Sequence, residues 1–526
     1  MKRILSLLFI LPTAFSCTAQ KPSKFSNLLT EEASKKHLTI LASKEFEGRG
    51  TGQEGGKKAV KYVEEQFKSF GLEPIVNGSY FQPLSLLQVS QKVDKFQIDN
   101  QDYAYGKDFY IQGDNEFVSY DASEIIFVGY GIQDEKFNEL KNTDIQNKII
   151  LVINEGEPVD ENGNFIISGN KEKSSWSSSR FKRLQELLKL NPKMVLSVTS
   201  QNEQIIQRMN NRGMQGRVML DKGAEARKSN QVAPVIHITP AVANTLLNKI
   251  NTSIEKFVST SHKAAQSTII KSTLNASLGV KNEKLNDPNV LGFLEGSDLK
   301  DEVIVISGHW DHDGILPNGT FFPGADDNGS GTVAVVELAK AFSEAKKQGK
   351  GPRRSILFIA LAAEEKGLLG SQFYVENPII PLDKIVTCLN IDMIGRIDDK
   401  HLEGDHNYIH VIGVNKLSTE LKPIVENANA DINLTLDYDY DHPDEPMRLY
   451  YRSDHYNFAK NGIPSLFFFS GLHPHYHTPE DTVDKIDFPI MVKREKLIFQ
   501  TAWEIANRDH KLVVDMPLED AQGTGR

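Results

Sequence analysis

The feature that most constrains the fold is an alternation of apolar strands and amphipathic helices after residue 280. The pattern predicts strands over residues 303–307, 355–362 and 386–391, with helices over 332–343 and 368–376. Nearly continuous apolar strands are typical of a parallel sheet that helices cover on both faces. We therefore predict an α/β fold with a mixed, mostly parallel sheet flanked by helices.

The chain has 526 residues, more than one hydrophobic core usually serves, so we expect more than one domain. Residues 117–272 contain short strands, such as 125–130 and 149–153, and few clusters of acidic or His residues. We interpret this stretch as an inserted β-rich module. The predicted order is a signal peptide over 1–16, the N-terminal part of the main domain over 17–116, the insert over 117–272, the main domain over 273–512 and a tail over 513–526.

The N-terminus predicts export. Lys2 and Arg3 precede a mostly apolar run over residues 4–11, which is too short to span a bilayer and is typical of a secretory signal. Cys17 follows this segment and resembles the lipidated cysteine of bacterial lipoproteins. The alternative is an ordinary signal peptide with Cys17 incidental. We expect an outer membrane lipoprotein, periplasmic or at the cell surface, or a secreted protein, with membrane contact only through a lipid anchor.

Charge and cysteine content exclude two function classes. The 60 basic and 70 acidic residues give a net charge of -10, without the Lys and Arg clusters that mark nucleic-acid binding. Apart from Cys17 the one cysteine is Cys388, which lies in an apolar stretch that predicts a buried strand. We therefore expect no nucleic-acid partner and no cysteine-peptidase chemistry.

Residues that can bind metal follow the carboxyl ends of the predicted strands, where open α/β sheets form their ligand sites. A single Asp or His at a strand end is usually a cap or a surface charge. Two His and three carboxylates at successive strand or loop ends match the ligands of a catalytic zinc pair. The candidates are His309 and Asp311, the glycine-rich stretch 324–331 with Asp326, Glu364 and Glu365, Asp392, and residues 473–477.

The adjacent residues Glu364 and Glu365 fit metal-assisted hydrolysis. One carboxylate can bind a metal while its neighbour takes a proton from the attacking water. The alternative interpretation is a pair of solvated glutamates at the start of a helix.

Three other polar segments are predicted to have no chemical role. We interpret residues 48–50 as a turn and the acidic segment 437–445 as a solvated loop. The group formed by His401, Asp405, His406 and His410 has no spacing that dictates a common face, and a polar turn accounts for it.

Six motifs together resemble metallopeptidase family 28, which includes secreted leucyl aminopeptidases and glutamate carboxypeptidase. They occur in the family's order between residues 280 and 510. They are residues 309–311, 324–331, 362–370, 390–395, 452–455 and 476–481.

The resemblance implies a zinc exopeptidase fold with two zinc ions per chain. It implies that His309 and Asp392 bind one zinc, that Glu365 and His477 bind the other, and that Asp326 bridges them before a cis peptide bond. It further implies that Glu364 is the general base, that Asp311 hydrogen-bonds the far nitrogen of His309, and that Tyr476 stabilises the tetrahedral intermediate.

The resemblance also suggests a substrate and a role for the insert. Arg452 either lines the substrate cleft or forms a structural ion pair, and residues 117–272 resemble a protease-associated domain. An aminopeptidase acting on peptides is the expected function. The alternatives are a carboxypeptidase, a glutaminyl cyclase with one zinc, and a receptor-like binding protein that has lost its metals.

Overall fold

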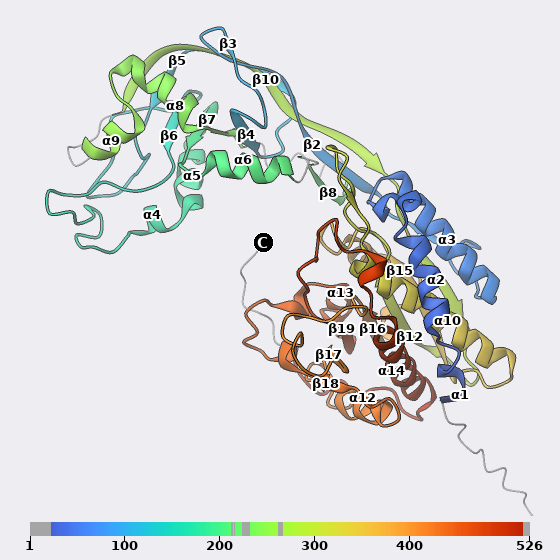
Figure 1. Ribbon diagram of the computed structural model, residues 1–526. Helices are drawn as coiled ribbons and strands as arrows, with labels where there is room; N and C mark the ends of the chain where they lie inside the picture. The colour runs from blue at the N-terminus through green and yellow to red at the C-terminus, as the bar shows by residue number, and fades with distance from the viewer. Residues whose placement is uncertain (1–22, 212–213, 215, 224–231, 261–266, 519–526) are drawn as a thin grey trace, which may run out of the picture.

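The computed structural model describes residues 23–211, 214, 216–223, 232–260 and 267–518 (Figure 1). The predicted signal peptide and Cys17 lie outside the described residues. Within the described part of the chain, no helix is long and apolar enough to cross a membrane. Two lobes are visible, each built on its own β-sheet. We call residues 23–85 with 286–518 the first lobe and residues 86–285 the second lobe.

The first lobe contains an eight-stranded sheet, and it confirms the predicted α/β fold with a mixed sheet. Four neighbouring strands, β15, β12, β16 and β19, run parallel, while β11 and β17 flank them in the antiparallel direction. The strand order is β1 (Phe81–Pro83), β11 (Pro288–Leu294), β15 (Arg354–Leu361), β12 (Leu299–His309), β16 (Ile385–Ile391), β19 (Ser465–Phe469), β17 (Tyr408–Ile412) and β18 (Thr435–Asp437).

Helices cover both faces of this sheet, as the apolar strands predict (Figure 1). Successive side chains of a strand point to opposite faces. Ile304 and Ile306 therefore pack in one core, whereas Val303 and Val305 pack in the other. The first core contains α2 (Glu31–Leu41), α3 (Glu54–Phe70), α10 (Gly331–Lys347), α12 (Leu421–Asn429) and α14 (Phe488–Asn507), and the second contains α11 (Leu369–Glu376) and α13 (His455–Ala459).

The second lobe is built on a nine-stranded sheet with separate apolar cores. Two long antiparallel strands, β2 (Leu86–Ile98) and β10 (Thr268–Leu285), run from the first lobe into it (Figure 1). The remaining strands are β3 (Gln101–Asp102), β4 (Phe109–Gln112), β5 (Val118–Phe127), β6 (Ile149–Ile153), β7 (Met194–Val198), β8 (Arg217–Leu220) and β9 (Val235–Ile238).

Helices of the second lobe pack around this sheet. They are α4 (Ser175–Ser178), α5 (Arg180–Leu188), α6 (Asn202–Asn211), α8 (Pro240–Leu247) and α9 (Ile254–Thr260). The sheet begins at Leu86, well before the predicted boundary at residue 117. The centre of β2 is partly exposed and carries mostly polar side chains, so its sequence shows little of the apolar alternation that marks a strand.

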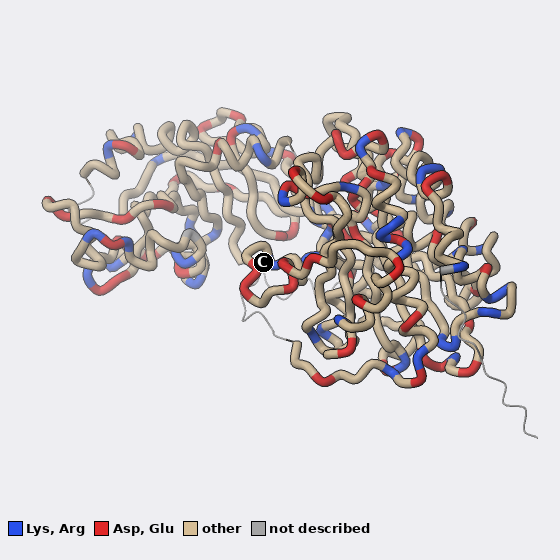
Figure 2. Tube along the Cα trace, turned by 60° about the horizontal axis from the view of Figure 1, so that its bottom comes forward, with Lys and Arg blue, Asp and Glu red and all other residues tan. Residues whose placement is uncertain are grey.

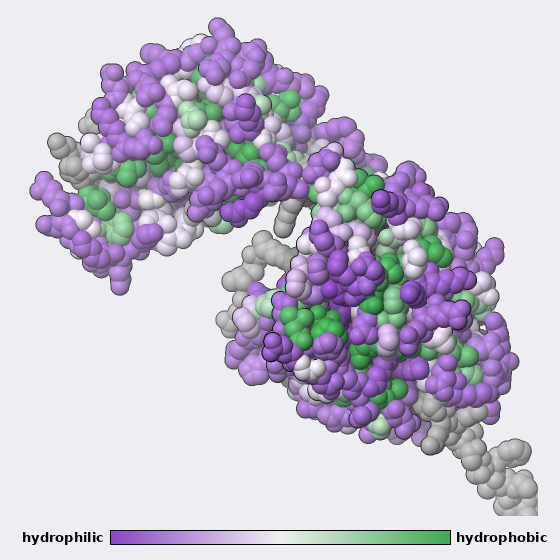
Figure 3. Space-filling model, viewed as in Figure 1, coloured by the Kyte–Doolittle hydropathy of each residue, from purple (hydrophilic) through white to green (hydrophobic). Residues whose placement is uncertain are grey.

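The surfaces of the two lobes are similar in character. Figure 2 shows acidic and basic residues interspersed over both lobes. The face in Figure 3 is mostly hydrophilic with scattered apolar patches, and the lobes meet there at a narrow junction.

Candidate active site

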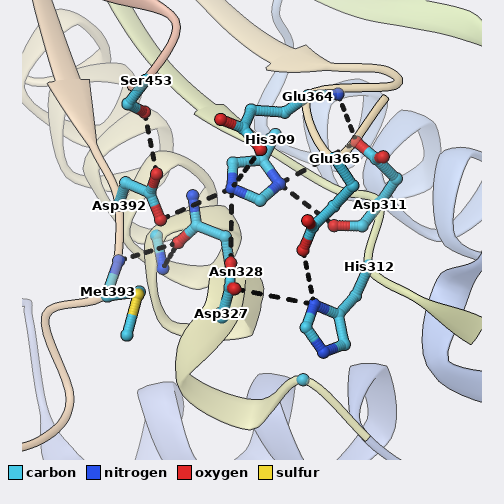
Figure 4. A network of polar contacts seen from close by, with 12 residues as sticks. His309, Asp311, His312, Asp327, Asn328, Glu364, Glu365, Asp392, Met393 and Ser453 are labelled. Carbon is cyan, nitrogen blue, oxygen red and sulfur yellow. Dashed lines mark hydrogen bonds and ion pairs between the residues drawn. The ribbon is translucent and has the colours of Figure 1, made fainter. Parts of the chain in front are cut away.

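The parallel strands of the first lobe bring the predicted site residues together at one edge of the sheet (Figure 4). His309 is the last residue of β12, and Asp392 directly follows β16. Glu364 and Glu365 lie in the loop after β15, and His477 lies in the loop after β19. Since β15, β12, β16 and β19 are neighbours, their carboxyl ends converge.

His309 and Asp392 form the first cluster. The Nε2 atom of His309 lies 3.4 Å from Oδ1 of Asp392 and 3.8 Å from Oε2 of Glu364. Ser453 Oγ donates a hydrogen bond of 2.7 Å to the other Asp392 oxygen. His309 Nε2 and Asp392 Oδ1 are both buried and neither has a hydrogen-bond partner among the described residues. Two unsatisfied atoms that face each other in this way fit a cation between them.

Glu365 and His477 form the second cluster. His477 Nε2 lies 3.2 Å from Oε2 of Glu365, and His312 Nδ1 lies 2.7 Å from Oε1. The other ring nitrogen of His477, Nδ1, lies 3.1 Å from Oδ2 of Asp313. A carboxylate on the far nitrogen of a histidine fixes the ring and directs the near nitrogen to a metal.

Asp327 lies between the two clusters. Its Oδ1 is 3.6 Å from Nε2 of His309, and its Oδ2 is 3.0 Å from Nε2 of His477. The Asp327 side chain is 4% exposed, so the carboxylate is held in place between the two histidines. Asp327 therefore has the position expected of a ligand that two metal ions share.

The structure corrects the expectation that Asp326 bridges the clusters. Asp326 Oδ1 accepts a hydrogen bond of 2.6 Å from the backbone N–H of Gly395, and Oδ2 lies 3.4 Å from His473 Nε2. The carboxylate of Asp481 accepts hydrogen bonds from the backbone N–H groups of both Asp326 and Asp327. These bonds hold the backbone so that Asp327, and not Asp326, faces His309 and His477. The cis peptide bond likewise lies between Asp327 and Asn328, one residue later than expected.

Asp311 contacts His309 differently from the prediction. His309 Nδ1 lies 3.0 Å from the backbone oxygen of Asp311 and 3.8 Å from the carboxylate, so the carbonyl is the closer acceptor. The carboxylate instead accepts hydrogen bonds of 3.0 Å from the backbone N–H of Glu364 and from Thr51 Oγ1. Asp311 thus orients both His309 and the loop that carries Glu364.

The two adjacent glutamates have opposite electrostatic environments. Burial raises the pKa of Glu364 well above its usual value, His309 opposes the rise, and the neighbouring Glu365 and Asp392 add to it. Burial also raises the pKa of Glu365, but His477 and His312 outweigh it and hold this pKa well below its usual value. This pairing suits one carboxylate that stays ionised as a ligand and one that exchanges a proton.

Arg49 holds the site together from outside the predicted set. Its guanidinium is fully buried and donates to the backbone oxygens of Trp310, Leu41, Pro323 and Gly324, at 2.7 to 2.9 Å. Trp310 follows His309, while Pro323 and Gly324 precede Asp327. The turn expected at residues 48–50 therefore also has a structural role, because Arg49 joins two loops that carry site residues.

An Arg49→Met substitution is expected to destabilise the first lobe by several kcal/mol, because each buried carbonyl left without a donor costs about 1–3 kcal/mol. Thermal unfolding followed by circular dichroism measures the shift. Lys44→Met, an exposed change in the same segment, is the matched control. Equal unfolding temperatures for the two variants would contradict this role of Arg49.

Arg452 and Tyr476 line a pocket beside the clusters. Among the described residues Arg452 forms no ion pair, so the structural ion pair considered for it is not found. Besides these two residues, the lining comprises Asp327, Glu364, Asp392, Met393, Leu449, Phe467, Phe469 and Leu472. The pocket lining thus combines apolar side chains with acidic groups.

The part of the first lobe that follows the second lobe in the chain matches a known protein family over most of its length. Residues 289–502 match peptidase family M28. All residues of the two clusters lie within this M28 segment. The first curated relatives match 39% to 43% of this chain.

"Leucine aminopeptidase 1" of Arthroderma otae is 34% identical over 216 residues, which are 39% of this chain and 55% of the relative. "Aminopeptidase YwaD" of Bacillus subtilis is 27% identical over 231 residues, 42% of this chain and 46% of the relative. The chain thus spans about half to three fifths of the length of the relatives it matches, 61% for the first of them.

Solved structures show the same fold over nearly the whole chain. An aminopeptidase from Aneurinibacillus sp. has a TM-score of 0.54 at 19% identity, with 95% of this chain and 100% of that chain covered. A zinc aminopeptidase from Bacillus subtilis has a TM-score of 0.51 at 17% identity, with 91% and 96% covered. The likeness extends through both lobes and shows a shared fold.

Sequence reasoning missed His312 and Asp313, which contact Glu365 and His477. Both lie in the short run from His309 to Gly314, where three acidic or histidine residues follow His309 within four positions. That density of metal-binding side chains was the available signal. It does not by itself say which of them faces which cluster.

Proposed function

We propose that the chain is a zinc-dependent aminopeptidase that releases N-terminal residues from peptides. The observation that carries the proposal is the position of Asp327 between a His309–Asp392 cluster and a His477–Glu365 cluster. The match of the M28 segment and the names of the similar proteins, leucine aminopeptidases and zinc aminopeptidases, support it.

In this proposal two zinc ions are held by residues of the two clusters. His309 and Asp392 would bind one ion, Glu365 and His477 would bind the other, and Asp327 would contribute a carboxylate oxygen to each. Nitrogen and carboxylate oxygen are suitable zinc donors. A bound zinc pair supplies a Lewis acid and lowers the pKa of water at neutral pH. His312, Asp313 and Asp311 hold the ligands in orientation through the contacts described above.

Glu364 has the role of proton carrier. It takes a proton from the attacking water and gives it to the leaving amine. A cation nearby favours the ionised form of Glu364, which offsets the rise that burial imposes on its pKa. Tyr476, in the same pocket, donates a hydrogen bond to the developing oxyanion. Arg452 has its guanidinium free among the described residues to bind a carbonyl or carboxylate of the peptide.

The test of function uses zinc-loaded protein and matched substrates. We expect hydrolysis of leucine 4-nitroanilide, no hydrolysis of its N-acetyl derivative, loss of turnover with a chelator and recovery with zinc. Cleavage of N-blocked dipeptides instead would indicate a carboxypeptidase. Conversion of N-terminal glutamine without hydrolysis would indicate a cyclase, and zinc binding without any turnover a binding protein.

We further propose that the chain is exported and anchored by a lipid on Cys17, and that the second lobe acts as a protease-associated domain in substrate selection. The apolar N-terminal run before Cys17 motivates the first part. A Cys17→Ser variant is expected to move from the membrane fraction to the soluble fraction of an expressing bacterium. An unchanged distribution would contradict the anchor.

A further inference from the structure

A further cluster of metal-binding side chains, separate from the two clusters of the candidate active site, lies at the far edge of the sheet in the first lobe. Asp398 and His401 belong to the segment between β16 and β17, His410 lies in β17, and Asp437 ends β18. Asp398 and His410 are buried, whereas the side chains of His401 and Asp437 are 20% and 14% exposed. The sequence predicted a polar turn for His401 and His410, and this is wrong for His410, which lies in a fully buried strand.

Each histidine of this cluster lies between the two carboxylates. On one side, Asp398 Oδ1 is 2.6 Å from His401 Nδ1 and Asp398 Oδ2 is 2.8 Å from His410 Nε2. On the other side, Asp437 Oδ2 is 3.7 Å from His401 Nε2 and Asp437 Oδ1 is 3.4 Å from His410 Nδ1. Two carboxylates and two imidazoles therefore form a closed ring.

Neutral histidines cannot satisfy this ring. A neutral imidazole has one N–H donor and one acceptor nitrogen. If His410 donates from Nε2 to Asp398, its Nδ1 lone pair faces the Asp437 carboxylate, which is also an acceptor. His410 Nδ1 is indeed buried without a hydrogen bond. The two carboxylates of the ring carry about two negative charges, which either two extra protons or one divalent cation would balance.

We propose that Asp398, His401 and His410 bind a divalent transition-metal ion, with Asp437 as the shared acceptor for the far nitrogens of both histidines. The ligand atoms of the three residues all lie within 4.8 Å of one another. Two nitrogen donors and one carboxylate suit zinc, with water as the fourth ligand from the exposed side of His401. Both imidazoles then donate N–H to Asp437, as histidines bound to metals commonly do.

The position of the cluster indicates a supporting role. Asp398 lies in the loop that begins with Asp392, and its backbone N–H donates a hydrogen bond of 2.7 Å to the Tyr408 hydroxyl. That hydroxyl donates a hydrogen bond of 2.6 Å to the backbone oxygen of Ser470, at the start of the loop that leads to His477. A side-chain carbon added at Gly471 would lie 2.2 Å from Asp398 Oδ2. An ion at Asp398 would thus tie together two loops of the active site.

Metal content distinguishes this site from the active site. Each protein is dialysed with zinc and then against metal-free buffer, and zinc per chain is measured by mass spectrometry. We expect His401→Ala to bind one ion fewer than the wild type. His406→Ala, an exposed histidine in the same segment, is the matched control and should bind as much as the wild type.

Two further variants complete the test. Asp437→Asn is expected to lower the affinity of the site for this ion about 10- to 100-fold, because the shared acceptor is lost. Asp327→Asn should keep the ion that His401→Ala loses, so failure of the proposed active site would not remove it. Zinc content equal to the wild type in both His401→Ala and Asp437→Asn would overturn the proposal and leave a ring of protonated histidines.

Discussion

Glu364→Gln is expected to lower kcat by about 10²- to 10⁴-fold, the range that a general acid or base contributes. Glutamine has the shape of glutamate but cannot take a proton from water. Because the proposed zinc ligands are other residues, the zinc content of the variant should equal that of the wild type. Steady-state kinetics with leucine 4-nitroanilide, together with zinc analysis, measure both quantities.

Glu376→Gln is the matched control for this variant, since Glu376 is an exposed residue at the end of α11. It should have wild-type kcat. Turnover by Glu364→Gln within a factor of about three of this control would contradict the role of Glu364, because general acid–base catalysis contributes far more. Loss of zinc from the variant would instead make Glu364 a ligand.

Asp327→Asn and Asp326→Asn are expected to differ sharply. Asp327→Asn removes a charge between the two clusters, so it should lose bound zinc and about 10³-fold or more in turnover, since the proposed zinc pair would activate the attacking water. Asp326→Asn keeps an oxygen that can accept the hydrogen bond from Gly395. It should therefore retain its zinc and most of its activity.

The comparison of these two variants tests directly whether Asp327, rather than Asp326, is the carboxylate shared by the two clusters. Each variant changes one of two adjacent buried aspartates into the same residue, so general effects on the segment are matched. If Asp326→Asn lost the zinc while Asp327→Asn kept it, the assignment of the bridging carboxylate would be wrong. Zinc content measured on folded protein, checked by circular dichroism, separates loss of metal from loss of structure.

The sequence sufficed for the sheet and for the place of the site. Apolar runs such as residues 385–391 predict buried strands, and the polar residues that follow them must meet where parallel strands end. His309, Glu364, Glu365 and Asp392 are all found there. These positions were predictable because burial leaves a strong signal in a short stretch of sequence.

Features that depend on backbone direction were not predictable. Asp326 and Asp327 are chemically identical neighbours, and only the backbone contacts with Asp481 decide which carboxylate faces the histidines. Arg49 reads as part of a glycine-rich turn, yet its four carbonyl partners come from distant segments. His410 was assigned to a polar turn because its partner Asp437 lies on another strand, which the local sequence does not reveal.

The most direct test of the account is anomalous diffraction at the zinc edge from a crystal of the zinc-loaded protein. We predict two strong peaks in the proposed active site, one beside His309 and Asp392 and one beside Glu365 and His477, with Asp327 between them. No peak at these residues, or peaks that Asp326 rather than Asp327 contacts, would contradict it.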